Sequence, residues 1–455
     1  MKAFTFFTSV AILSLSFSQG VAQESNIKRE AISLTVYNSN LGVVKDRRLL
    51  NVKNGISEIT LNDISSQIDP TTVKLSTLNH PEAIVIREQN YRYDLIDQET
   101  VLQKYIDRPI TYSDDKKNVL EGTLLSSDGK RLTLLTAKGI CMITIGTGQV
   151  TVPSLPEGLI TRPTLVWQLE SKQQLNSEPV EVLYQTTGLT WHAEYIASLA
   201  NNDSSIDISG WVSIENNSGI SYPNAHLKVV AGNLRKVESL FNKKRERERR
   251  FYGLPNSNTD FEERGMFEYH LYDLGRQITI ANNEVKQLSL LNKAGIKVEK
   301  LYTYSGGPSV GVSLKFKNAE ANNLGIPLPE GVIRVMKADK DGVLEFVGED
   351  RIQHTPREED VIVSVGTAFD LVGKHEVTDY QKLGDKSIKR SYKITLNNHK
   401  NEAVVITATD GFFGDWSIVE SSKDYSKKNA SAIEFIIPLK PHSTESVTYT
   451  VISSL

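Results

Sequence analysis

The alternation of apolar and polar residues along most of the chain beyond residue 30 is the feature that most constrains its fold. Ile32, Leu34 and Val36, for example, alternate with polar neighbours. Side chains on a β-strand point alternately to the two faces of a sheet, so this pattern predicts strands with one buried face. Turn residues interrupt the pattern at short intervals, and Asn54-Gly55 predicts a hairpin. We therefore expect an all-β, multidomain protein of antiparallel sheets and sandwiches.

Composition narrows the class of protein further. The chain has 455 residues, of which 39% are hydrophobic and 24% charged, as in globular proteins of two to four domains. Lys and Arg number 52 against 55 Asp and Glu, so no excess of positive charge favours nucleic acid, and we expect no nucleic-acid partner. Cys141 is the single cysteine. The chain therefore cannot hold an internal disulfide or a cysteine-rich metal site.

The first 22 residues resemble a secretory signal peptide. Lys2 precedes a short apolar stretch at 3–17, and Gly20-Val21-Ala22 places small residues before a predicted cleavage between Ala22 and Gln23. The apolar stretch is shorter than the roughly 20 residues that span a bilayer, although an N-terminal anchor is the alternative. No later stretch is long and apolar enough to cross a membrane. We expect an exported protein, periplasmic or extracellular.

Four regions follow the predicted signal peptide. Residues 23–96 form an N-terminal β region, 97–156 a small module, 157–348 a central β domain and 349–455 a C-terminal domain. The small module has a helical segment at 99–106 followed by five short strands, and Gly122 to Asp128 is similar to the Sm-like or SH3-like small barrel. The last region has the strand density of an immunoglobulin-like sandwich. Residues 236–264 include a dense run of charged residues and predict a mobile charged insertion in the central domain.

Several ordered segments carry a family resemblance. They include Tyr37-Asn38, Ile68 to Val73, Tyr184 to Trp191, Gly210 to Gly219, Gly348 to Ile352, His354-Thr355-Pro356 and Gly414-Asp415-Trp416. These segments resemble the large bacterial family catalogued as domain of unknown function 4139, and similar C-terminal segments occur in proteins named for mucoidy inhibition. The resemblance covers most of the chain beyond the signal peptide. It implies an exported β-rich protein, and it supplies no catalytic residues to transfer.

A few residues are candidates for a binding site. They combine imidazole, carboxylate, guanidinium and indole groups and lie in the central domain and at the start of the C-terminal domain: Trp191, His192, His270, Glu349, Arg351 and His354. A zinc or acid–base site could be built from such groups, but no two of the histidines stand at ligand spacing. The alternatives are hydrogen-bonded structural histidines and an ion-pair cluster at residues 349–351 that joins two domains.

Other motifs give no support for a reactive site. Asp339-Lys340-Asp341-Gly342 resembles the start of a calcium loop, but position twelve would be Gly348, so a hairpin turn is expected. There is no phosphate-binding motif of the form Gly-x-x-x-x-Gly-Lys. Trp191, Trp211 and Trp416 could form a carbohydrate platform, although strand tryptophans more often belong to the core.

These observations predict a non-catalytic binding or structural protein of the cell envelope, with no cofactor and no metal. Its partner would be another envelope protein or a surface polymer. An assembly factor with an open sheet edge would fit the same pattern. The alternative is an envelope hydrolase whose site is assembled from distant residues around His270, His354 and Glu349.

Overall fold

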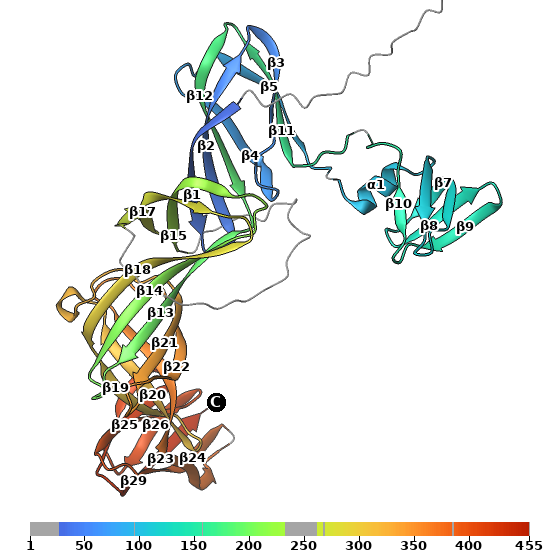
Figure 1. Cartoon of the computed structure of the whole chain (residues 1–455). Coiled ribbons are helices and arrows are strands. Elements are labelled where there is room, and N and C mark those ends of the chain that lie inside the picture. The colour runs from blue at the N-terminus through green and yellow to red at the C-terminus, as the bar shows by residue number, and fades with distance from the viewer. Residues whose placement is uncertain are drawn as a thin grey trace, which may run out of the picture. The chain divides into compact units, whose positions relative to one another are not determined.

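The computed structural model describes residues 27–94, 96–156, 158–232, 262–266, 269–384 and 386–454. It consists almost entirely of strands, which confirms the all-β prediction (Figure 1). The predicted signal peptide and most of the charged insertion lie outside the described residues. The end of that insertion does not, because residues 262–264 belong to a strand. The described chain contains no helix that is long and apolar enough to span a membrane.

Two compact units divide the chain. The first contains the residues up to Glu30, Arg47–Ile64 and Ser76–Glu181, and the second contains Ala31–Asp46, Ser65–Leu75 and Val182–Leu455. The first unit includes an antiparallel three-stranded sheet of order β3-β11-β5. Its strands are β3 (Gly55–Leu61), β11 (Thr164–Ser171) and β5 (Ile84–Arg92). Four of the eight residues of β11, among them Trp167, are apolar and buried, so this strand is the centre of the sheet.

The small module lies in the same unit and matches the predicted elements. Helix α1 (Gln98–Lys104) begins at Asp97, whose carboxylate accepts a hydrogen bond from the Thr100 amide at 2.7 Å. The five strands are β6 (Pro109–Ser113), β7 (Val119–Ser127), β8 (Arg131–Thr136), β9 (Gly139–Thr144) and β10 (Gln149–Thr151). They form an antiparallel sheet of order β10-β6-β7-β8-β9. The sheet does not close into the predicted barrel, because β9 and β10 remain its two edges.

A seven-stranded sheet of order β16-β17-β15-β1-β2-β12-β4 contains the N-terminal strands. Its members are β1 (Ile27–Tyr37), β2 (Leu41–Val52), β4 (Ile68–Thr77), β12 (Leu175–Thr186), β15 (Tyr222–Ala231), β16 (Glu262–Met266) and β17 (Tyr269–Ile280). The alternation on β1 buries Ile32, Leu34 and Val36. The predicted hairpin at Asn54-Gly55 is wrong, because the strands on either side of it, β2 and β3, belong to different sheets.

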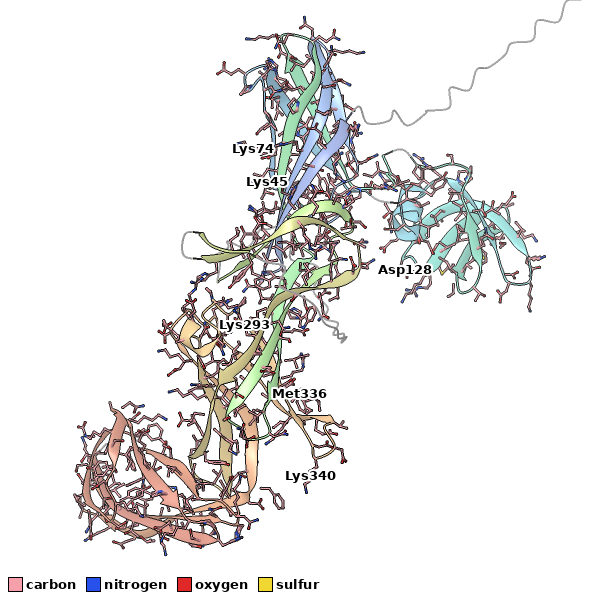
Figure 2. The ribbon with its side chains drawn as sticks, turned by 60° about the vertical axis from the view of Figure 1, so that its left-hand side comes forward. Lys45, Lys74, Asp128, Lys293, Met336 and Lys340 are labelled. Atoms are coloured by element: carbon pink, nitrogen blue, oxygen red, sulfur yellow. The ribbon has the colours of Figure 1, made fainter. Side chains whose placement is uncertain are left out.

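A five-stranded sheet of order β18-β14-β13-β21-β22 forms the middle of the second unit. Its strands are β13 (Leu189–Leu199), β14 (Ser205–Asn216), β18 (Glu284–Lys297), β21 (Gly331–Ala338) and β22 (Leu344–Ile352). β21 and β22 are joined by the turn predicted at Asp339, whose carboxylate accepts hydrogen bonds from the amides of Asp341 and Val343, both at 2.9 Å. Lys340, in that turn, is labelled in Figure 2.

The C-terminal region folds as a sandwich built from one nine-stranded sheet, ordered β26-β29-β24-β23-β20-β19-β25-β28-β27. Its strands are β19 (Glu299–Tyr304), β20 (Ser309–Lys317), β23 (Asp360–Lys382), β24 (Ser387–Asn398), β25 (Val404–Gly411), β26 (Asp415–Ser421), β27 (Ser426–Asn429), β28 (Ala432–Leu439) and β29 (Ser443–Ser454). The first part of β23 pairs with β20 and the second with β24, so this long strand belongs to both halves of the sheet. Side chains from both halves, such as Phe435 and Val447, share one core. The sandwich also takes β19 and β20 from before residue 349, with the short 3₁₀ helix η1 (Glu320–Asn322) following β20.

Candidate functional site

The strands β13 and β22 of the five-stranded sheet carry four of the six residues predicted for a binding site. Trp191 and His192 are neighbours on β13 and therefore point to opposite faces of the sheet. Trp191 is buried, and its indole N–H donates to the Val230 carbonyl at 3.1 Å. His192 has 53% of its side chain exposed. Glu349 and Arg351 follow on β22, and His354 comes shortly after that strand ends.

Glu194 organises the half-exposed face on which His192 lies. Its carboxylate oxygens lie 3.6 Å from His192 Nε2 and 3.7 Å from Arg334 Nη1. It also accepts hydrogen bonds from Gln287 at 2.9 Å and from the Ser213 hydroxyl at 3.3 Å. The contact with His192 lowers the pKa of the Glu194 carboxyl against the opposing effect of partial burial. Glu194 is therefore held as a carboxylate by groups from β13, β14, β18 and β21.

Two further ion pairs involve predicted residues. Glu349 Oε2 lies 3.3 Å from Arg334 Nε, and that arginine also contacts Glu194, so one guanidinium links β13 with β22. Arg351 Nη1 lies 3.3 Å from Glu330 Oε1. The first pair joins strands of one sheet, and the second ties β22 to the residue before β21. Asp350, between them in sequence, accepts a hydrogen bond at 2.7 Å from the amide of Ser364 on β23, a strand of the nine-stranded sheet.

His354 is fixed by the backbone of Glu330. The Glu330 amide donates to His354 Nδ1 at 3.0 Å, so Nδ1 is unprotonated and Nε2 carries the proton of the neutral ring. Burial lowers the pKa of His354, the Glu330 carboxylate opposes that effect, and His270 adds to it. His270, on β17, is therefore close enough to act on His354 electrostatically. The structure brings His354 and Arg351 to Glu330, which sequence reasoning had not selected, and His270 acts electrostatically on His354.

On the face of the five-stranded sheet that carries Glu194, the charged and polar side chains pair with one another. The Ser213 hydroxyl donates to Glu194 and accepts from Gln287, so its hydrogen bonds are made to a carboxylate and an amide. Among the described residues, no group of three or more His, Cys, Asp and Glu side chains could hold a metal ion. The ion pairs and hydrogen bonds of Glu194 hold neighbouring strands together. Trp191, on the opposite face of β13, belongs to the core, where its ring meets that of Tyr272 edge-on.

A second titratable cluster was missed by sequence reasoning. In the C-terminal sandwich the Tyr449 hydroxyl donates to Asp410 at 2.5 Å, and His375 Nε2 lies 3.1 Å from the same hydroxyl. Burial, followed by the nearby Asp410, raises the pKa of Tyr449. The rings of His375, Tyr392 and Tyr449 stack on one another. The three hydrogen-bonded residues are 35 to 74 positions apart in sequence, so no spacing pattern could have indicated the cluster.

The half-buried Trp416 is not an open platform for a sugar. Lys427 Nζ lies 4.9 Å from the centre of the Trp416 ring, and the indole N–H donates to the Ala430 carbonyl at 2.9 Å. A cation over the ring occupies the face that a sugar would use. Trp191 is buried, and Trp211 on β14 is half-buried.

The edge strand β9 of the small module has the features of a site that binds another protein. β9 pairs with β8 on one side, and the order of the sheet leaves its other side without a partner strand. Ile140 and Met142 are 65% and 83% exposed, and Leu135, paired with Ile140, is 48% exposed. The backbone groups along such an edge can pair with another strand, and the apolar side chains add surface that a partner would bury.

β9 differs from every other sheet edge in the described chain. The edge strands β3, β4, β5, β16, β18, β22, β26 and β27 each contain at least one charged residue. β10 has none, but it is only three residues long. β9 has six residues, Gly-Ile-Cys-Met-Ile-Thr, with no charge and no proline, and it pairs with β8 without a bulge. Charges, prolines, bulges and short lengths are the features that protect sheet edges, and β9 lacks all of them.

Comparison with protein-family models and with curated proteins finds no match for this chain. The resemblance to domain of unknown function 4139 therefore stays a prediction. One of its segments has a clear structural role: Asn216 donates to the carbonyls of Ile220 and Ala281, both at 2.9 Å, and accepts from the Ser218 hydroxyl at 2.8 Å. That segment contributes to the described structure through hydrogen bonds that fix the connection between β14 and β15.

Proposed function

We propose that the chain is an exported, non-catalytic binding protein of the cell envelope that captures an extended segment of another protein at β9. The observation that carries the proposal is the unprotected edge of β9, with Ile140 and Met142 largely exposed. A partner strand would extend the sheet by main-chain hydrogen bonds, and its alternate side chains would cover these two residues. The signal-like N-terminal sequence supports export.

One arrangement with a second copy of this chain, pairing of β9 with β10, would cover β9 only in part. The sheet's other edge, β10, has only three residues. Head-to-tail pairing of β9 with β10 would therefore leave half of β9 uncovered. We expect a partner segment of about six residues, with apolar residues at alternate positions and no negative charge opposite Ile140 or Met142.

Site-specific cross-linking tests this proposal. A photoreactive amino acid is placed at Ile140 and, as a matched control, at Ile436, which is 66% exposed on the interior strand β28. We expect a cross-link to a partner protein in intact envelopes from position 140 alone. In the same chain, Met142→Lys should reduce its yield about tenfold or more, because the partner strand would have to bury an unpaired ammonium group.

Two results would contradict the proposal. Equal cross-linking from positions 140 and 436, unchanged by Met142→Lys, would show that β9 has no special role. A cross-link only between copies of this chain would show self-association in place of capture of another protein. Circular dichroism of the Met142→Lys protein confirms that the module is still folded, which is expected because Met142 is 83% exposed.

A further inference from the structure

An open hollow of about 360 Å³ lies between β17 and β18 in the second unit. It is lined by Arg276, Gln277, Ile278 and Thr279 of β17 and by Lys286, Gln287 and Leu288 of β18. Its volume is at the lower end of the range of small-ligand sites, about 300–1,000 Å³. The hollow is separate from β9, and its function does not depend on strand capture.

The topology explains why the hollow exists. β17 and β18 are consecutive in the chain, but β17 pairs with β15 and β16 in the seven-stranded sheet, while β18 pairs with β14 in the five-stranded sheet. The two strands therefore diverge after the turn between them, and no ladder of hydrogen bonds fills the space. Both strands are held by their own sheets, so the side chains that line the hollow project from fixed backbones.

The lining has the chemistry of an anion site with additional hydrogen-bonding groups. Arg276 and Lys286 supply two cationic groups, one from each strand, and none of the seven lining residues is acidic. Gln277, Thr279 and Gln287 supply amide and hydroxyl groups between the cations. Two apolar residues, Ile278 and Leu288, are buried and form part of the base.

Three of these polar groups are oriented by contacts within the protein, and two of them, Lys286 and Thr279, keep a hydrogen to donate. Lys286 Nζ lies 2.9 Å from Glu284, which uses one of its three donors. The Gln287 amide nitrogen donates to Glu194 and Ser213, which fixes the orientation of its side chain. The Thr279 hydroxyl accepts from the Asn224 amide at 3.1 Å and still has its own hydrogen to donate. Oriented donors lose less conformational entropy when a ligand binds.

We propose that this hollow binds a carboxylate-bearing sugar unit of an acidic polysaccharide. Arg276 and Lys286 would bind the carboxylate, and the amide and hydroxyl groups would bind the hydroxyls of the ring. The lining contains no aromatic residue on which a nucleotide base could stack. Its two apolar members are buried, so it offers little surface to a lipid chain. The hollow is open at the surface, which allows a polymer to pass through it.

Calorimetric titration of the purified protein tests this site. The probes are a hexamer of galacturonate, the neutral hexamer maltohexaose, and a polyglutamate of similar charge. We expect binding of the galacturonate hexamer only, weakened about tenfold or more by Arg276→Gln combined with Lys286→Gln, because charge-assisted hydrogen bonds are lost. Lys293→Gln is the matched control, since Lys293 lies on β18 outside the lining and is labelled in Figure 2.

Each other outcome would overturn part or all of the proposal. Failure of the galacturonate hexamer to bind would remove the acidic-sugar site. Equal binding of polyglutamate would show a general attraction for polyanions. An equal loss of affinity in the Lys293→Gln protein would place the binding elsewhere. Unchanged thermal unfolding of all three proteins confirms that the substitutions act on binding.

Discussion

The small module and the C-terminal sandwich differ in how their sheet edges are protected from pairing with other chains. Each is an open sheet with two edge strands. The sandwich ends at β27, which is four residues long, consists of exposed residues only, and contains Lys427 and Lys428. The small module ends at β9, which is longer and carries no charge. Lysines on an edge discourage pairing with other chains, so the difference indicates that one edge is protected and the other is available.

The two regions also differ in the size of their cores. The sandwich core contains 17 buried residues and the core of the small module contains eight, so each buried side chain is a larger part of the small module's stability. A region of about 60 residues has only about 3–9 kcal/mol of stability in total. The module that presents the open edge is therefore the one that tolerates least damage.

Equivalent core truncations should separate the two regions most strongly. Leu134→Ala and Phe435→Ala each remove a fully buried side chain, and we expect losses of about 2–5 and 3–5 kcal/mol respectively. The first loss is a large part of the small module's total stability, so this module should open often enough for a protease to cleave it, whereas the second should leave the sandwich folded but less stable. Protease digestion with mass spectrometry locates the cleaved segment. Cleavage within 97–156 in both proteins, or in neither, would contradict the difference in core size.

Alkaline pH should distinguish the two regions more than acid pH, because Asp360 of the sandwich also has a lowered pKa. In the small module, hydrogen bonds from backbone amides and side chains lower the pKa of Asp97, Asp114 and Asp128, so their stabilising effect is lost as pH falls below about 4. In the sandwich, burial raises the pKa of Tyr304 and Tyr449, so stability is lost as pH rises above about 10.

Unfolding of each region as a function of pH measures this contrast. Tyr449→Phe should reduce the alkaline loss in the sandwich and cost about 1–2 kcal/mol at neutral pH, because Asp410 and His375 lose a hydrogen-bond partner. If the Tyr449→Phe protein loses as much stability above about pH 10 as the unmodified protein does, ionisation of Tyr449 on unfolding does not contribute to that loss. Tyr425→Phe is a control, since Tyr425 is 39% exposed.

Removing the protection of β27 should make that edge resemble β9. The combined change Lys427→Val and Lys428→Val costs the sandwich about 0.5–1 kcal/mol, because Lys427 leaves the face of Trp416. We expect the variant to self-associate in analytical ultracentrifugation at concentrations where the unmodified protein is monodisperse. A variant with unchanged sedimentation would show that these lysines do not protect the edge. Lys389→Val, on the interior strand β24, controls for the loss of charge.

Sequence predicted the strands well and their partners poorly. The alternation at Ile32, Leu34 and Val36 reports which side of a strand is buried, and the five strands of the small module lie where the turn residues placed them. Pairing is set by packing between distant segments. β1 pairs in parallel with β15, almost 200 residues later, and no local signal indicates this.

The candidate sites show the same limit. His192 and Glu194 are two positions apart on one strand, so their common face could have been predicted. Arg334 reaches Glu194 only because β21 lies beside β13, and the sequence does not show this. The uncharged stretch at 139–144 is visible in the sequence, but only the sheet order shows that it forms an edge.

Amide hydrogen exchange across β9 is the decisive test of whether this strand pairs with a partner. The purified protein is compared with the cross-linked partner complex, and exchange is followed separately for β9 and β27. If β9 captures a strand, the amides of 139–144 that point away from β8 should become protected at least tenfold in the complex, because the new strand accepts their hydrogen bonds, while 426–429 are unchanged. Protection that appears elsewhere and leaves β9 exchanging as in the free protein would contradict it.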